Sequence, residues 1–145
     1  MTSSEKIMDT VKSKQDLRAM DDDMHRLFKK KDINLMDKYM SKDGIYMGTD
    51  PNEIFNYNDL RNYFDKFFKD TASKLSDYTI SHKNVSVHGP SAVIINQYIL
   101  PDISKKVMVR NIGHARFENG NWIIDMYSWN LISKNADIPK INKAL

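Results

Sequence analysis

The stretch DGIYMGTDPNEIFNYNDLRNYFDKFF, residues 43–68, decides the fold of this chain. Ile45–Gly48 predicts a short strand, and Pro51 ends it because proline lacks an amide proton and restricts the residue before it to extended geometry. A helix follows, for which we expect Asn58 to be the N-cap. Its apolar residues recur at helical spacing, which predicts a helix that covers a large apolar surface such as a sheet. These residues are Leu60, Tyr63, Phe64, Phe67 and Phe68.

The chain before this stretch has the pattern of two helices. Ser13 and Asp16 have the spacing of a capping box, and one apolar stripe follows them at steps of three and four. The stripe consists of Leu17, Met20, Met24, Leu27 and Phe28. We interpret Asp21–Asp23 as part of the opposite, solvated face, since consecutive helical residues point about 100° apart and cannot converge on one ion. A second, short helix is predicted over Ile33–Met40, with Asp32 as its cap.

After residue 75 the pattern changes to that of β-strands. Four strands are predicted, over residues 78–88, 92–100, 107–117 and 122–131. Gly89-Pro90 separates the first two strands, and Asn119-Gly120, a strong turn signal, joins the last two as a hairpin. The tail from Ser133 is polar, and we expect it to fray. Three helices followed by a meander of strands predict an α+β domain, with the helices on one face of a curved antiparallel sheet.

Length and composition limit the class of protein. The 145 residues suit one domain, which we place at 13–133 between a polar N-terminal arm (1–12) and a polar C-terminal tail (134–145). The chain has no cysteine, so disulfides and thiolate sites are excluded. The net charge of +3 is spread without a basic stripe, so we expect no nucleic-acid binding. No apolar run is long enough for a bilayer and the first residues do not resemble a secretory signal, so we expect no membrane association and a cytoplasmic location.

Most of the chain, from about Leu17 to Asn130, resembles the SnoaL-like branch of the nuclear-transport-factor-2-like superfamily. The matching pieces are LFKKKDINLMDKYM (27–40), DGIYMGTDPNEIF (43–55), NDLRNYFDKFF (58–68) and VRNIGHARFENGNWII (109–124). The resemblance implies a cone-shaped half-barrel of the cystatin-like type, a pocket between sheet and helices, and a homodimer formed through the outer face of the sheet. Members of the superfamily include isomerases, dehydratases, cyclases, hydrolases and association modules, so the fold does not fix the function. Relatives often carry two histidines on the closing strand, where this chain has Met126 and Ser128.

Arg110 and His114 are polar candidates on the strand beside the expected pocket, and the face that they occupy depends on the Asn119-Gly120 turn. A two-residue turn places His114 opposite Asp125 in a cross-strand ion pair. A three-residue turn with a glycine bulge shifts the pairing by one residue, so that Arg110 and His114 share a face with Ser128. We favour the bulged form because it gathers the positions that relatives use around the pocket. Exposed or interface positions are the alternative.

Four further residues are candidates for the same pocket. Asn96 and Tyr98 alternate on an apolar strand, where a buried asparagine needs a partner and a ligand is one option. Tyr46 and Asp50 lie where the short strand meets the helices. Asp50 is a candidate general base if it is buried, because burial raises the pKa of a carboxyl group. We favour the alternative, that Asp50 forms the turn before Pro51.

The histidines do not predict a metal site. His82 and His88 lie on one strand roughly 20 Å apart, and His25 lies on the first helix without a partner four residues away. There is no glycine-rich phosphate loop either, and we expect no cofactor.

We therefore expect a homodimeric pocket protein that binds a small, largely apolar organic molecule. If the protein is an enzyme, a ketosteroid-isomerase-like isomerase or lyase that transfers a proton is the expected class, with Asp50 or His114 as the catalytic candidate. The alternative is a non-catalytic dimerisation module. The predicted ligand-binding residues are Tyr46, Asn96, Tyr98, Arg110, His114 and Ser128.

Overall fold

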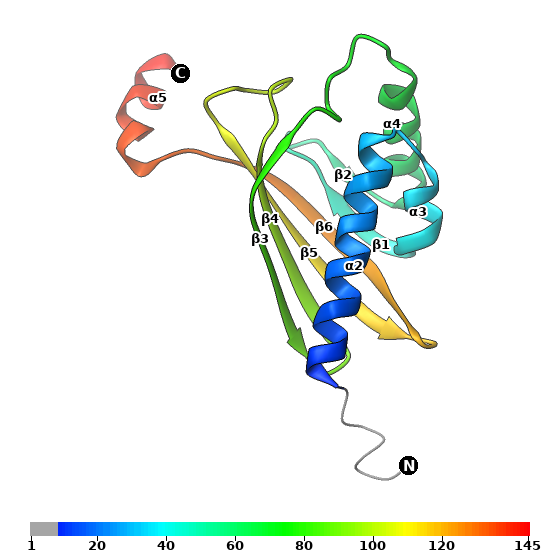
Figure 1. Ribbon diagram of the computed structural model, residues 1–145. Helices are drawn as coiled ribbons and strands as arrows, with labels where there is room; N and C mark the ends of the chain where they lie inside the picture. The colour runs from blue at the N-terminus through cyan, green and yellow to red at the C-terminus, as the bar shows by residue number, and fades with distance from the viewer. Residues whose placement is uncertain (1–8) are drawn as a thin grey trace.

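The protein, seen in a computed structural model that describes residues 9–145, consists of helices packed on one face of a curved, unclosed six-stranded sheet (Figure 1). The strand order is β2-β1-β6-β5-β4-β3. The strands are β1 (Met40–Met47), β2 (Ile54–Phe55), β3 (Thr79–His88), β4 (Ser91–Ile99), β5 (Met108–Glu118) and β6 (Asn121–Ile132). The predicted α+β architecture is confirmed. The sheet is mixed rather than wholly antiparallel, because β1 pairs with β6 in parallel.

The first helix, α2 (Thr10–Lys29), begins three residues before the predicted cap. Asp9 is its N-cap, and the Asp9 carboxylate accepts a hydrogen bond from the Lys12 amide at 3.1 Å. Of the expected polar arm, residues 1–8 lie outside the described residues. The short helix α3 (Asn34–Tyr39) follows, and Asp32 accepts a hydrogen bond from the Asn34 amide at 3.0 Å.

The aromatic helix α4 (Tyr57–Lys69) is capped by Asn56, not by Asn58 as predicted. The Asn56 side chain accepts a hydrogen bond from the amide of Asp59 at 2.8 Å. Leu60 and Phe64 on the predicted face are buried, and the two phenylalanines that follow pack against the core. Tyr63 is the exception, since it remains 41% exposed at the edge of this face.

The core lies between α2 and the concave face of the sheet. The apolar stripe of α2 is buried there as predicted, apart from the partly buried Phe28 at its end. The buried residues of the stripe are Leu17, Met20, Met24 and Leu27. They share one cluster with Ile94, Ala115 and Ile124 of the strands and with Leu60 and Phe64 of α4. The concave face is therefore covered by helices, and α2, α3 and α4 all lie on that side (Figure 1).

The β5–β6 hairpin combines features of both predicted registers. Asn119 and Gly120 have φ angles of 53° and 81°, and Glu118 pairs with Asn121, so the turn has two residues and the favoured three-residue turn is wrong. The register then shifts further along the hairpin, where His114 pairs with Met126 and Asp125 is the extra residue. Arg110 and His114 thereby share the outer face with Ser128, away from the helices.

The polar tail differs from the expected frayed segment. It contains a 3₁₀ turn, η1 (Asn135–Asp137), and a helix, α5 (Ile138–Ala144), and none of their residues is buried. No helix in the part of the chain that the structure describes is both long and apolar enough to cross a membrane.

We predict that Leu17→Ala lowers the free energy of unfolding by about 2–5 kcal/mol, because it leaves a cavity beneath α2. Leu17 is 0% exposed, whereas Leu131 on β6 is 48% exposed. The same substitution at Leu131 therefore costs about 0.5 kcal/mol or less. Urea denaturation of both variants measures the difference, and equal losses would contradict the position of the core.

Candidate functional site

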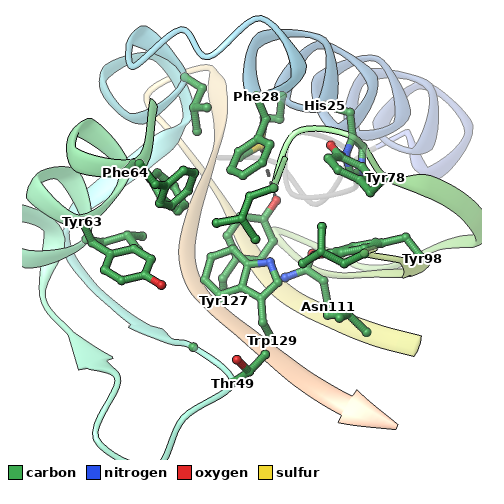
Figure 2. Close-up of a pocket in the computed structure, with 18 of the residues that line it drawn as sticks. His25, Phe28, Thr49, Tyr63, Phe64, Tyr78, Tyr98, Asn111, Tyr127 and Trp129 are labelled. Carbon is green, nitrogen blue, oxygen red and sulfur yellow. Dashed lines mark hydrogen bonds between the residues drawn. The ribbon is translucent and has the colours of Figure 1, made fainter. Parts of the chain in front are cut away.

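A cavity of about 140 Å³ lies between the concave face of the sheet and helices α2 and α4 (Figure 2). Its lining is mainly aromatic and aliphatic. The aromatic residues include Phe28, Phe64, Phe67, Tyr98, Tyr127 and Trp129. Tyr63 and Ile103, which are 41% and 42% exposed, also line the cavity and mark its open end.

Contacts between aromatic rings form the walls of the cavity. Phe28 on α2 packs edge-on against Phe64 and Phe68 of α4, with ring centroids 5.5 and 5.3 Å apart. On the sheet, the ring of Tyr127 lies against Gly113, where an added Cβ would come within 2.4 Å of the ring. The glycine thus lets Tyr127 lie flat on β5 and leaves space above it.

One side of the cavity is polar. The hydroxyl group of Tyr78 lies 2.6 Å from Nδ1 of His25 (Figure 2). Nε2 of His25 lies 3.6 Å from the Asp21 carboxylate. Asp21 also accepts a hydrogen bond from the side chain of Asn96 at 2.9 Å. Asp21, His25 and Tyr78 all line the cavity, and we call them the polar cluster.

The titratable groups of the polar cluster are deeply placed. Burial lowers the pKa of His25, the charge of Asp21 opposes this shift, and the charge of Lys83 adds to it. The imidazole is therefore neutral at pH 7. Burial also raises the pKa of Tyr78 and of Tyr98, so both phenols keep their protons.

The position of Asp21 assigns the tautomer of His25. A neutral imidazole carries one proton, and the carboxylate beside Nε2 favours the proton on that nitrogen. Nδ1 is then the acceptor for the Tyr78 hydroxyl proton. Two buried polar atoms without a hydrogen-bond partner, Nε2 of His25 and Oδ1 of Asn96, belong to this region.

The structure brings two of the predicted binding residues to this site. Tyr98 lines the cavity, with its ring 4.9 Å from that of Tyr78. Asn96 does not line the cavity but holds Asp21 in place from β4. Tyr46 is fully buried in the core outside the cavity, where its hydroxyl group donates to the Ser41 carbonyl at 2.6 Å.

The other predicted residues do not face the cavity. On the outer face, Arg110 donates a hydrogen bond to the Gln97 side chain at 2.8 Å, and His114 contacts Asp125 at 2.5 Å. Ser128 shares that face. Asp50 is exposed in the turn before β2, where its carboxylate accepts a hydrogen bond from the Asn52 amide at 2.9 Å. Asp50 thus forms the turn, as favoured from the sequence.

The sequence interpretation missed all three members of the polar cluster: it gave Tyr78 no role in a site and left His25 without a partner. Asp21 was assigned to a solvated face, yet it is only 4% exposed, and it is the partner four residues before His25. The spacing contained the signal, because Asp21 follows Leu17 by four residues and precedes Met24 by three, on the apolar stripe itself. Within residues 9–145, no group of three His, Asp or Glu side chains is placed to hold a metal ion.

A curved sheet backed by helices is a fold that known structures share. An NTF2-like protein of unknown function from Pseudomonas putida KT2440 is similar with a TM-score of 0.71 and 12% identity, over 87% of this chain and 91% of that chain. A candidate ketosteroid isomerase from Parabacteroides distasonis ATCC 8503 has a TM-score of 0.63 and 13% identity, over 81% of this chain and 86% of that chain. A candidate calcium/calmodulin-dependent protein kinase II association domain from Xanthomonas campestris has a TM-score of 0.62 and 20% identity. The similarity covers 81% of this chain and 86% of that chain. At these identities the likeness concerns the fold alone.

The family follows from the sequence comparison. Residues 17–128 match the model of the SnoaL-like domain, and the chain belongs to this family. A search of the curated proteins found no match to the sequence.

We predict that the free energy of unfolding falls as the pH decreases from about 6.5 towards the lowered pKa of His25, because the unfolded chain takes up a proton that the folded site resists. His25→Gln makes this decline shallower. His82→Gln changes an exposed histidine on β3 and keeps the wild-type slope. Urea denaturation at a series of pH values measures the slopes, and identical slopes for all three proteins would contradict the burial of His25.

Proposed function

We propose that the protein binds a small, mostly apolar organic molecule that contains a ring and a polar oxygen. The observation that carries this proposal is an aromatic cavity with its polar cluster on one side. Its volume of about 140 Å³ is close to that of an apolar cavity of about 150 Å³ that holds one benzene molecule. A single ring therefore fits inside, and larger parts of the molecule extend through the open end at Tyr63 and Ile103.

The polar cluster gives the ligand its orientation. Aromatic walls bind a ring without fixing the direction of its substituents, whereas the Tyr78 hydroxyl group offers a directional hydrogen bond. Tyr98 adds a second phenol on the same side. Proton transfer of the isomerase or lyase type suits this arrangement, because a neutral imidazole is an effective proton acceptor near pH 7. Neither Asp50 nor His114 reaches the cavity, so we assign the role of the base to His25.

Self-association is supported by a different part of the molecule. The outer face of the sheet carries apolar side chains that are partly exposed, while the described helices α2, α3 and α4 lie on the other face (Figure 1). The central residues are Val93, Ile95, Ile112 and Met126. We propose that this face buries against a second copy of the chain. As a non-catalytic association module, the protein would need only this surface.

We predict that Phe67→Leu weakens the binding of small phenols and naphthols about tenfold, because a wall of the cavity loses a ring contact of about 1.4 kcal/mol. Phe117→Leu makes the same change at a residue that is 37% exposed on the hairpin, outside the cavity, and leaves binding unchanged. Isothermal titration calorimetry with a panel of such compounds gives the dissociation constants. Failure of every compound to bind, or equal losses in both variants, would contradict the proposal.

We predict that Ile112→Glu converts the dimer to a folded monomer, since it places an unpaired charge in the middle of the outer face. Asn62→Glu introduces the same charge on the exposed side of α4 and keeps the dimer. Light scattering coupled to gel filtration measures the mass, and circular dichroism checks the fold. A monomeric wild-type protein would refute the proposed association.

A further inference from the structure

We infer that Tyr78 and His25 take up a proton from a hydroxyl group of the bound molecule, with Asp21 orienting His25 for this transfer. The inference rests on the proposed function and adds the chemical class of the ligand, a ring compound with an ionisable hydroxyl group, such as a phenol or an enol. Tyr78 and His25 are the residues that carry the chemistry, and Asp21 is a positioning residue.

The contacts form one chain from the cavity to the carboxylate. The Tyr78 oxygen lies 2.6 Å from Nδ1 of His25, within the range of a strong hydrogen bond. Nε2 on the other side of the ring faces Asp21 at 3.6 Å. Because the Tyr78 proton is directed to Nδ1, the lone pairs of the Tyr78 oxygen are left for a donor in the cavity. A hydroxyl group is such a donor, whereas a ketone or an ether oxygen is not.

The transfer conserves atoms and charge. The O–H bond of the ligand breaks and its proton moves to the Tyr78 oxygen, while the original Tyr78 proton moves to Nδ1 of His25. The ligand is left as an oxyanion, which accepts a hydrogen bond from the re-formed Tyr78 hydroxyl group. The imidazole becomes an imidazolium with one N–H directed at Tyr78 and the other at Asp21.

The charges around His25 determine how readily it accepts this proton. On α2, Asp21 favours the imidazolium and Lys29 opposes it; from β3, Lys83 also opposes it. Tyr78, which contacts His25, and Tyr98, whose ring lies 4.9 Å from that of Tyr78, are neutral phenols. Lys83 lies 3.7 Å from the second Asp21 oxygen, so part of its charge is compensated there. The oxyanion formed on the ligand supplies the additional negative charge that stabilises the imidazolium.

A purely structural role explains the cluster less well. A buried carboxylate and imidazole cost free energy that apolar side chains of similar size avoid. In this protein the cost is not fully offset, since Nε2 of His25 has no hydrogen-bond partner within the required geometry. The polar cluster lies at the cavity surface, where a ligand reaches it. Perturbed titratable groups in a cavity are typical of sites that act on a ligand.

The test uses 4-nitrophenol, a one-ring probe whose ionised form absorbs visible light. Calorimetry first gives its affinity for the wild-type protein and for His25→Gln, Tyr78→Phe, Asp21→Asn and the matched control His82→Gln. Absorbance titration of the bound probe then gives the pH at which it ionises on each protein. We expect ionisation on the wild-type protein and on His82→Gln at a pH about one unit lower than on His25→Gln and Tyr78→Phe, because the neighbouring imidazolium stabilises the phenolate.

Asp21→Asn is expected to bind the probe with the wild-type affinity but to ionise it at a pH closer to that of His25→Gln. A purely structural role of Asp21 would not change the ionisation of the probe in this way. If the probe binds to all five proteins and ionises at the same pH on each, the relay is refuted while the proposed function stands. If the probe does not bind to the folded wild-type protein, the proposed function fails and the relay fails with it. Tyr78→Phe keeps the aromatic ring and decides the outcome by itself if the variants of the buried α2 residues do not fold.

Discussion

The packing of α2 across the concave face of the sheet is the interaction on which both the core and the cavity depend. The leucines and methionines of α2 bury against the strands, and Phe28 near its end contacts the rings of α4. Burial of this stripe supplies the main stabilisation of a helix that would be marginal by itself in water. Because Asp21 and His25 lie along the same stripe, the packing that buries the leucines also carries a carboxylate and an imidazole into the interior.

The placement of these polar groups has an energetic reason. A carboxylate in an apolar core is stable only with partners, and Asp21 has the amide of Asn96 and the ammonium group of Lys83 beside it. Those partners come from β3 and β4, so the polar cluster forms only when α2 docks in one position along the strands. The aromatic rings around the cavity exclude water and strengthen the electrostatic interactions within it. Fold stability and site geometry are therefore set by the same contacts.

The two faces of the sheet carry different features. The inner face carries the cavity, and the outer face carries a partly exposed apolar surface together with the pair of His114 and Asp125. The bulge at Asp125 was decisive for the assignment of residues to faces. Sequence reasoning considered a bulge only at the turn and so directed Arg110 and His114 to the pocket. In the structure the turn is regular and the bulge lies further along the hairpin, at Asp125, and the bulged strand β6 has no glycine or proline there.

The sequence by itself determined the order of the three helices α2, α3 and α4 and of the strands β1 and β3 to β6 along the chain, the amphipathic faces of α2 and α4, the hairpin at Asn119-Gly120 and the family resemblance. These features depend on periodicity and on local turn chemistry, which neighbouring residues fix. Only the tertiary structure decided which polar residues meet, because the polar cluster joins His25 to Tyr78 across 53 positions of the chain and Asp21 to Asn96 across 75. Local sequence patterns do not predict contacts between residues so far apart in the chain. The docking of α2 on the sheet and the register of β3 against β4 bring these residues together.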